Sequence, residues 1–411
     1  MRRPSARRFA IAITIGKGPL VTDHARFPLL DGYRALAVCL VLTTHVGFFS
    51  GVILLPGVGP FVARMDFGVT LFFLLSGFLL YRPWALAAMT GANPPKISIY
   101  ALRRTGRILP AYWVMAGVVL VFLPFLLPIA RADWSDWVKY LGLVHIYGRD
   151  LPLAGFGQIW SLATELAFYA ALPVIAWIAG RLGRGDAPRS SRRQLIVLTC
   201  CLGIAVGFNY LSIGPFADTL VLAGTWLPAH LDWFAAGMAF AVIQSRLTLP
   251  NPPRWMAVVR RLAQDTPTCL VLAVALFALA STPIAGPAAY ESSHTPQSLL
   301  TKNALYLVIA VALLLPGFLG GAQAQQSLWG RALTNRIVVY VGVVSYGIFL
   351  WHMAVMTVLT YEFGWEAQWA TFFVLWVSTA IIAMALATVS WRALERPVQK
   401  LTHRWRPQSS R

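Results

Sequence analysis

The chain has 411 residues, 58% of them hydrophobic, and a mean hydropathy of +0.65. These values exceed those of soluble domains and indicate an integral membrane protein with several spanning segments. The net charge is +19, but the basic residues gather in short polar segments between apolar runs, without a basic stripe interleaved with aromatics. This pattern argues against nucleic-acid binding and favours a lipid bilayer as the surroundings.

Ten apolar runs are candidates to cross a bilayer. They cover roughly 34–54, 67–81, 109–129, 161–180, 194–212, 219–243, 267–284, 302–319, 338–360 and 370–391. The second run is short, and the segment LPAHLDW interrupts the sixth, which predicts a broken or tilted helix packed against protein or a wet cavity. The predicted fold is an all-α integral membrane protein with about ten transmembrane helices.

The distribution of lysine and arginine predicts the orientation. An even number of spans places both termini on one side, and the segments on that side hold 28 of the 34 basic residues, against five in the opposite loops and Arg34 at the boundary. Because basic loops stay in the cytoplasm, both termini are predicted to be cytoplasmic. We expect a basic tail at 1–29, a transmembrane domain at 30–395 and a second basic tail at 396–411, in the plasma membrane.

The four cysteines, Cys39, Cys200, Cys201 and Cys269, all fall inside apolar runs and show no CxxC spacing. This arrangement supports neither a disulfide framework nor a metal site. We therefore read the cysteines as small buried residues and expect no metal cofactor.

The first predicted helix carries two ionisable residues, Arg34 and His45. Eleven residues correspond to about three helical turns, so the two side chains lie on nearly one face and about 16 Å apart in depth. Ionisable residues inside membrane helices mark functional sites or polar pathways. With the N-terminus inside, Arg34 lies near the cytoplasmic face and His45 lies in the outer half of the membrane.

Three other polar residues are predicted at the depth of His45: Glu165 in the fourth run, His352 in the ninth and Asp66 at the start of the second. A carboxylate beside a histidine fixes its tautomer and stabilises the imidazolium, which suits a general base. We therefore expect Glu165 near His45. The alternatives are a packing role for His45 bonded to a backbone carbonyl, a proton relay at Glu165 and a structural role for His352.

The segment YALRRTGRILPAYW, at the cytoplasmic start of the third long run, contains Arg103, Arg104 and Arg107. Arg104 and Arg107 are three residues apart and share a helix face. Guanidinium groups bind phosphates through forked hydrogen bonds, so an anionic ligand is a candidate here. The alternative is ordinary flanking charge at the cytoplasmic end of a helix.

Two further residues are candidates to line a cavity. Ser76 lies in FFLLSGFLLYRPW without the GxSxG pattern of a serine nucleophile, which favours a small packing residue. Asp232 lies in the break of the sixth run, where it either lines the cavity or bonds backbone amides that the break leaves free.

At these residues the sequence resembles membrane-bound acyltransferase family 3. DGYRALAV…TTH contains the family's arginine and histidine, here Arg34 and His45, and RTGR contains its paired arginines. The segments DFGVTLFFLLSGFLL, WSLATELAFY, SYGIFLWH and LERP also resemble family segments, in the expected order, so that the resemblance covers about residues 30–400.

The resemblance implies transfer of an acyl group, most often acetyl, from cytoplasmic acyl-CoA to a hydroxyl of a glycan, glycolipid or secondary metabolite. It implies that His45 is the general base with Arg34 as its helix partner, that Glu165 supports His45, and that Arg104 and Arg107 bind coenzyme A. The competing hypothesis is a transporter or flippase of a lipid-linked sugar, with His45 and Glu165 as a proton relay.

Overall fold

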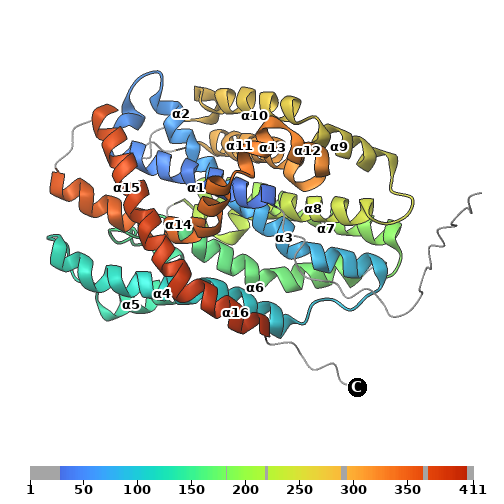
Figure 1. Ribbon diagram of the computed structural model, residues 1–411, viewed down its shortest axis with the longest axis horizontal. Helices are drawn as coiled ribbons and strands as arrows, with labels where there is room; N and C mark the ends of the chain where they lie inside the picture. The colour runs from blue at the N-terminus through green and yellow to red at the C-terminus, as the bar shows by residue number, and fades with distance from the viewer. Residues whose placement is uncertain (1–27, 182, 218–220, 288–293, 364–368, 405–411) are drawn as a thin grey trace, which may run out of the picture.

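The computed structural model describes residues 28–181, 183–217, 221–287, 294–363 and 369–404, so the first 27 and last seven residues of the two predicted tails lie outside it. Every regular element in these ranges is helical (Figure 1). The helices are α1 (Pro28–Phe49), α2 (Gly59–Ala63), α3 (Gly68–Thr90), α4 (Ile97–Leu126), α5 (Trp134–Leu141), α6 (Ile159–Arg181), α7 (Ala187–Ile213), α8 (Leu231–Leu247), α9 (Arg254–Gln264), α10 (Thr266–Ala280), α11 (Pro296–Leu319), α12 (Gly321–Gln326), α13 (Leu328–Leu333), α14 (Arg336–Phe363), α15 (Trp369–Ser390) and α16 (Arg396–Arg404).

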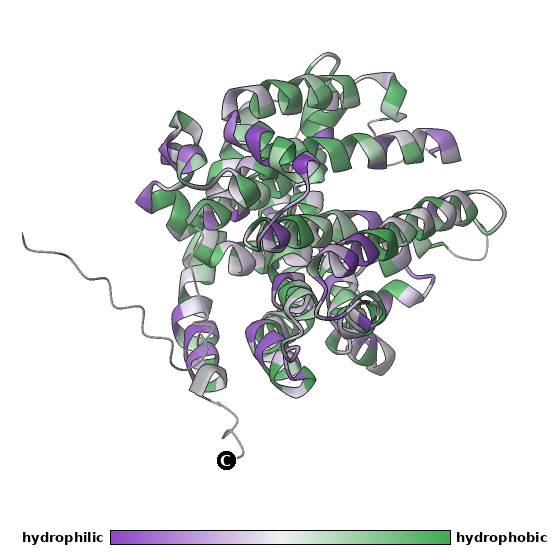
Figure 2. Cartoon of the chain, turned by 90° about the vertical axis from the view of Figure 1, so that its right-hand side faces the viewer, coloured by the Kyte–Doolittle hydropathy of each residue, from purple (hydrophilic) through white to green (hydrophobic). Residues whose placement is uncertain are grey.

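Each of the ten predicted apolar runs overlaps a helix in the described residues, and long stretches of these helices are coloured as hydrophobic in Figure 2. Among the described residues, eight helical segments are long and apolar enough to cross a membrane, and α9 with α10, bent by 81°, make a ninth candidate. Helices α8 and α10 have only 17 and 15 residues. At about 1.5 Å per residue each falls short of the roughly 30 Å hydrocarbon core. The predicted all-α, multi-pass membrane fold is confirmed.

The predicted break in the sixth run is present. A 3₁₀ turn, Leu227–His230, precedes α8. Asn209 of α7 donates from Nδ2 to the carbonyl of Ala229 at 2.7 Å, and so satisfies a backbone group that the break leaves outside a regular helix. A polar side chain from a neighbouring helix is what allows an irregular backbone at membrane depth.

Helices α3 and α8 cross in unusually close contact, because each contributes a glycine at the crossing. A Cβ added to Gly77 would overlap the carbonyl oxygen of Phe234, and one added to Gly237 would overlap that of Leu74. The rings of Phe73 and Phe234 stack beside the crossing with centroids 4.4 Å apart. Small residues at such crossings let membrane helices approach and gain packing contacts.

Helix α1 packs against α14, although the two lie at opposite ends of the sequence (Figure 1). Gly342 of α14 permits this contact, since a Cβ there would overlap the carbonyl oxygen of Asp31. Helix α14 in turn packs against α15. The first and the late helices therefore form one wall of the interior.

The connection between α4 and α6 contains the short helix α5, whose N-terminus is closed by a reciprocal capping box of Asp133 and Asp136. The ring of Tyr140 stacks on His145, with centroids 4.7 Å apart. His145 is buried, which lowers its pKa to about 4. Trp226, which precedes the break, donates from Nε1 to the carbonyl of Ile146 at 2.7 Å. These contacts fix the connection against the helical body.

Candidate active site

Helix α1 places one ionisable side chain in each of two cavities. Arg34 lines the first cavity and His45 lines the second. Val69, at the start of α3, lines both, so the two cavities are neighbours. Asp31 accepts a hydrogen bond from Arg34 Nη1 at 2.7 Å, one helical turn away. This local ion pair neutralises part of the charge that α1 carries.

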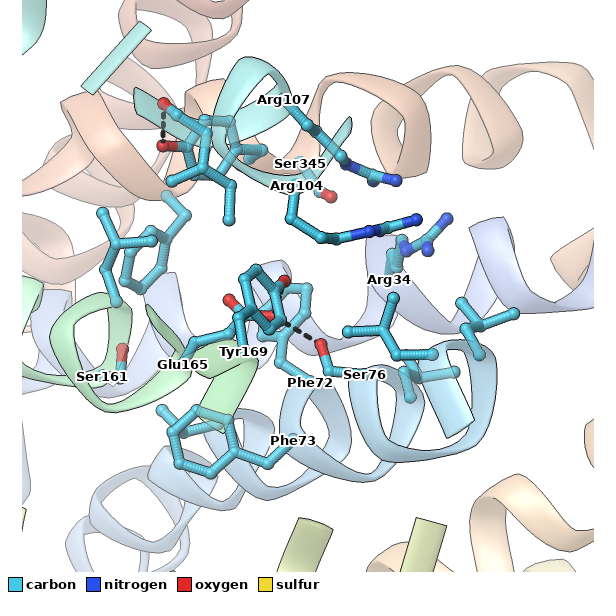
Figure 3. A pocket seen from close by; sticks show the side chains of 18 residues that line it. Arg34, Phe72, Phe73, Ser76, Arg104, Arg107, Ser161, Glu165, Tyr169 and Ser345 are labelled. Atoms are coloured by element: carbon cyan, nitrogen blue, oxygen red, sulfur yellow. Dashed lines mark hydrogen bonds between the residues drawn. The ribbon is translucent and has the colours of Figure 1, made fainter. Parts of the chain in front are cut away.

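The first cavity is rich in arginine (Figure 3). It has a volume of about 90 Å³ and is lined from α1, α3, α4, α6 and α14. The guanidinium groups of Arg104 and Arg107, both from α4, lie beside that of Arg34. Among the described residues, neither Arg104 nor Arg107 has a hydrogen bond or an ion pair, and Arg104 Nε is buried. Three cations with so little compensation have the chemistry to bind an anionic ligand.

Glu165 is the one acidic residue among those that line the first cavity. Its Oε1 accepts hydrogen bonds from Ser76 Oγ at 2.5 Å and from Tyr169 OH at 2.6 Å. Within the described part of the chain Glu165 forms no hydrogen bond to His45. The expected pairing of this carboxylate with the imidazole is therefore replaced in the structure by a Ser76–Glu165–Tyr169 cluster below the arginines (Figure 3).

His45 has a different partner. Its Nδ1 lies 2.8 Å from the carbonyl oxygen of Val41 and 3.3 Å from Nε2 of His352. His352 comes from α14 and is only 1% exposed. The contact of α1 with α14 brings these two histidines together, and no spacing within the sequence could have paired them.

The second cavity, of about 330 Å³, is larger and carries both polar side chains and aromatic walls. Asp66 lies in it and accepts a hydrogen bond from the hydroxyl of Tyr306. Lys302 lies 5.8 Å from the centre of the Tyr306 ring. The other polar or aromatic side chains that line it are Thr44, His45, Arg64, Trp160, Asn209, Thr225, His230, Trp233, His294 and Asn303. Such a mixture of flat apolar faces and hydrogen-bonding groups suits a polyhydroxylated ligand.

Arg64 shapes one edge of the second cavity. Its Nε donates to the carbonyl of Ala280 at 3.0 Å, and its Nη2 donates to those of Ala285 at 3.0 Å and Gly286 at 2.6 Å. The residue thereby ties the connection after α10 to the turn before α3. His294 lies close by, and burial with the nearby positive charges lowers its pKa to about 4, so it is neutral at pH 7.

Three sequence candidates lie apart from these cavities or at their margin. Asp232 is buried at the start of α8 and accepts from the backbone N–H of Trp233 at 2.9 Å, so it serves the break and is not among the lining residues. Arg103 is also not among the residues that line either cavity. His352 reaches the second cavity only through His45.

Tyr169 and Tyr306 were missed by sequence reasoning. For Tyr169 a signal existed, because it lies four residues after Glu165 and so on the same face of α6. Tyr306 follows Lys302 by four residues in the same way, but its bond to Asp66 joins positions 240 residues apart.

In the described ranges, no group of three or more His, Cys, Asp or Glu residues has the geometry of a metal site.

The chain is similar in sequence to known acyltransferases. The family model described as "Acyltransferase domain" matches residues 27–392. The chain is 26% identical over 391 residues to the peptidoglycan O-acetyltransferase OatA of Listeria monocytogenes, covering 91% of this chain and 56% of OatA. It is 25% identical over 404 residues to nodulation protein 10 of Rhizobium leguminosarum bv. viciae, covering 90% of this chain and 93% of that protein. The O-acetyltransferase OatA of Staphylococcus aureus (strain NCTC 8325 / PS 47) is 23% identical over 390 residues, with 91% and 57% covered.

The chain thus spans little more than half the length of the OatA proteins that it matches, and nearly the whole length of nodulation protein 10. No solved structure matches it. The family match extends across all the helices that line the two cavities, from α1 to α14. By this match and by its helical architecture, the chain belongs to the membrane-bound acyltransferase family 3.

Proposed function

We propose that the protein transfers an acyl group, most often acetyl, from a coenzyme A thioester to a hydroxyl of a glycan or glycolipid of the cell envelope. One observation carries the proposal. Helix α1 contributes an arginine to the arginine-rich cavity and a histidine to the neighbouring cavity, and Val69 lines both. A donor phosphate site beside a potential general base is the arrangement that acyl transfer from coenzyme A requires.

The donor would occupy the first cavity. Arg34, Arg104 and Arg107 would bind its phosphates. The thioester arm would lie inside this cavity and the phosphates at its arginine end. With both termini in the cytoplasm, as the basic loops predict, this end faces the cytoplasmic pool of acyl-CoA.

The acceptor would occupy the second cavity. His45 would take the proton of the acceptor hydroxyl while the oxygen attacks the thioester carbonyl. The new C–O bond forms as the C–S bond breaks, and the leaving thiolate takes up the proton. The names of the OatA relatives support a glycan acceptor. The aromatic and amide side chains of the second cavity offer the stacking faces and hydrogen bonds that a sugar needs.

The test uses the purified full-length chain in nanodiscs with radiolabelled acetyl-CoA and envelope glycolipids. Wild type should transfer label, and His45→Ala should lower transfer by about 10²- to 10⁴-fold, the usual contribution of a general base. His145→Phe serves as the matched control, because it removes a histidine that lines neither cavity and keeps an aromatic ring in its place. Equal transfer by wild type and His45→Ala, or failure of wild type with several donors and acceptors, would overturn the proposal.

The same preparation separates acyl transfer from transport. A transporter that used His45 and Glu165 as a proton relay would move a fluorescent lipid-linked sugar across proteoliposomes in response to a pH gradient, without acyl-CoA. In the structure these two residues line different cavities, and no hydrogen bond among the described residues joins them. We therefore expect no movement that depends on the pH gradient.

A further inference from the structure

His45 contacts a second histidine, His352, where the sequence had led us to expect a carboxylate. The rings lie with centroids 5.1 Å apart and planes inclined by 46°, and His45 Nδ1 is 3.3 Å from His352 Nε2. We infer that His352 is a positioning residue, which fixes the tautomer of His45 and supports its protonated form. This inference rests on the proposed function, because it assigns a role beside the proposed base.

The protonation of His352 follows from its own helix. Its Nδ1 lies 2.8 Å from the carbonyl oxygen of Phe349 and 3.2 Å from that of Ile348. Carbonyl oxygens only accept hydrogen bonds, so Nδ1 must carry the hydrogen. In the neutral ring Nε2 then has a free lone pair, and this lone pair faces His45.

The protonation of His45 follows in turn. Its Nδ1 faces two acceptors, the carbonyl oxygen of Val41 at 2.8 Å and Nε2 of His352 at 3.3 Å. If the hydrogen were on Nε2 of His45, its Nδ1 would carry a lone pair. That lone pair would face the lone pairs of the Val41 oxygen and of His352 Nε2, with no hydrogen between them. The hydrogen therefore lies on Nδ1, and Nε2 is the basic nitrogen. Among the described residues nothing hydrogen-bonds to this Nε2, and His45 lines the second cavity, where the acceptor would bind.

During transfer the pair would act as follows. His45 Nε2 takes the proton of the acceptor hydroxyl as the C–O bond forms. The resulting imidazolium still donates from Nδ1 to Val41 and His352, and both hydrogen bonds strengthen because the donor is now charged. The proton then passes from Nε2 to the thiolate released when the C–S bond breaks. His352 keeps its own hydrogen throughout and exchanges none.

Two substitutions at His352 separate this role from simple space filling. Leucine fills much of the site without an acceptor, whereas the amide oxygen of glutamine can take the place of Nε2. His352→Leu should lower kcat by about 10- to 100-fold, the effect of losing a hydrogen bond to a charged group. The KM values for acyl-CoA and acceptor should change less than about twofold, because substrate binding is not involved. His352→Gln should recover kcat to within about threefold of wild type.

The double variant His45→Ala/His352→Leu completes the test. If His352 acts through His45, the double variant should be no slower than His45→Ala alone. Full activity of His45→Ala would refute the proposed function itself. Loss of activity in His45→Ala, together with a wild-type kcat in His352→Leu, would refute only the role of His352. A His352→Gln variant as slow as His352→Leu, with an unchanged melting temperature, would also refute it.

Discussion

Neutralising Arg104 or Arg107 should weaken the binding of coenzyme A, but it should leave the melting temperature unchanged or raise it. Each lines the first cavity, and among the described residues neither forms an ion pair. With Arg34 they leave a cluster of three cations beside the single carboxylate of Glu165. The perturbation is Arg104→Gln or Arg107→Gln, and each removes one charge from this cluster.

The magnitude follows from Coulomb's law. A guanidinium about 5 Å from a phosphate contributes roughly 3 kcal/mol at an effective dielectric constant of about 20. This corresponds to an approximately hundredfold rise in the Kd for coenzyme A. Without the donor, removal of one of three like charges relieves repulsion. The melting temperature should therefore stay the same or rise by about 1–3 °C.

The assay is calorimetric titration of coenzyme A into the purified protein, with a thermal melt of each variant. Arg103→Gln is the matched control, because it removes the same charge one residue away and does not line the cavity. Unchanged affinity in both Arg104→Gln and Arg107→Gln would refute the reasoning, as would an equal loss in Arg103→Gln. A fall in melting temperature of several degrees would show that these arginines are structural.

Three further predictions concern the body of the protein. Gly237→Val should lower the melting temperature by at least several degrees, because its side chain would overlap the Leu74 carbonyl, whereas Gly203→Val, which has open space around it, should change it little. The stability of wild type should fall as the pH drops from about 6.5 to about 4, because in this window His145 gains a proton in the unfolded chain but not in the folded one. The cost is up to about 1.4 kcal/mol per pH unit. A melt series in which His145→Phe shows the same slope would contradict this. A cysteine in place of Arg192 should react with an impermeant maleimide only in inside-out vesicles, and labelling of intact cells would reverse the predicted orientation.

The sequence contained enough information to predict the helices, and it assigned each polar residue an expected depth. Hydrophobic runs identify spans, and the alternation of basic loops orders them, so Arg34 and the α4 arginines were expected at one level. Depth is only one coordinate, however. Glu165 and His45 were expected together, but the structure places them in neighbouring cavities, because lateral positions depend on which helices pack side by side.

The pairing of helices depends on individual glycines, which hydrophobic periodicity does not distinguish from other residues. The crossing of α3 with α8 depends on Gly77 and Gly237, which in sequence are only two of the 32 glycines. The contact of α1 with α14 likewise needs Gly342. The expected depth of His352 made it a candidate, but its contact with His45 follows only from that helix pair.

The pairing of α1 with α14 also determines when the site can form. His352 follows His45 by 307 residues, so a ribosome adding about 5–20 residues per second needs roughly 15–60 s between the two. Throughout this interval Arg34 is already in the membrane, where its local ion pair with Asp31 is available from the start. The three arginines therefore enter the membrane early, whereas both cavities need α14, which supplies Ser345 and Phe349 to the first cavity and His352 beside the second. Neither site can be complete before that late helix has been inserted.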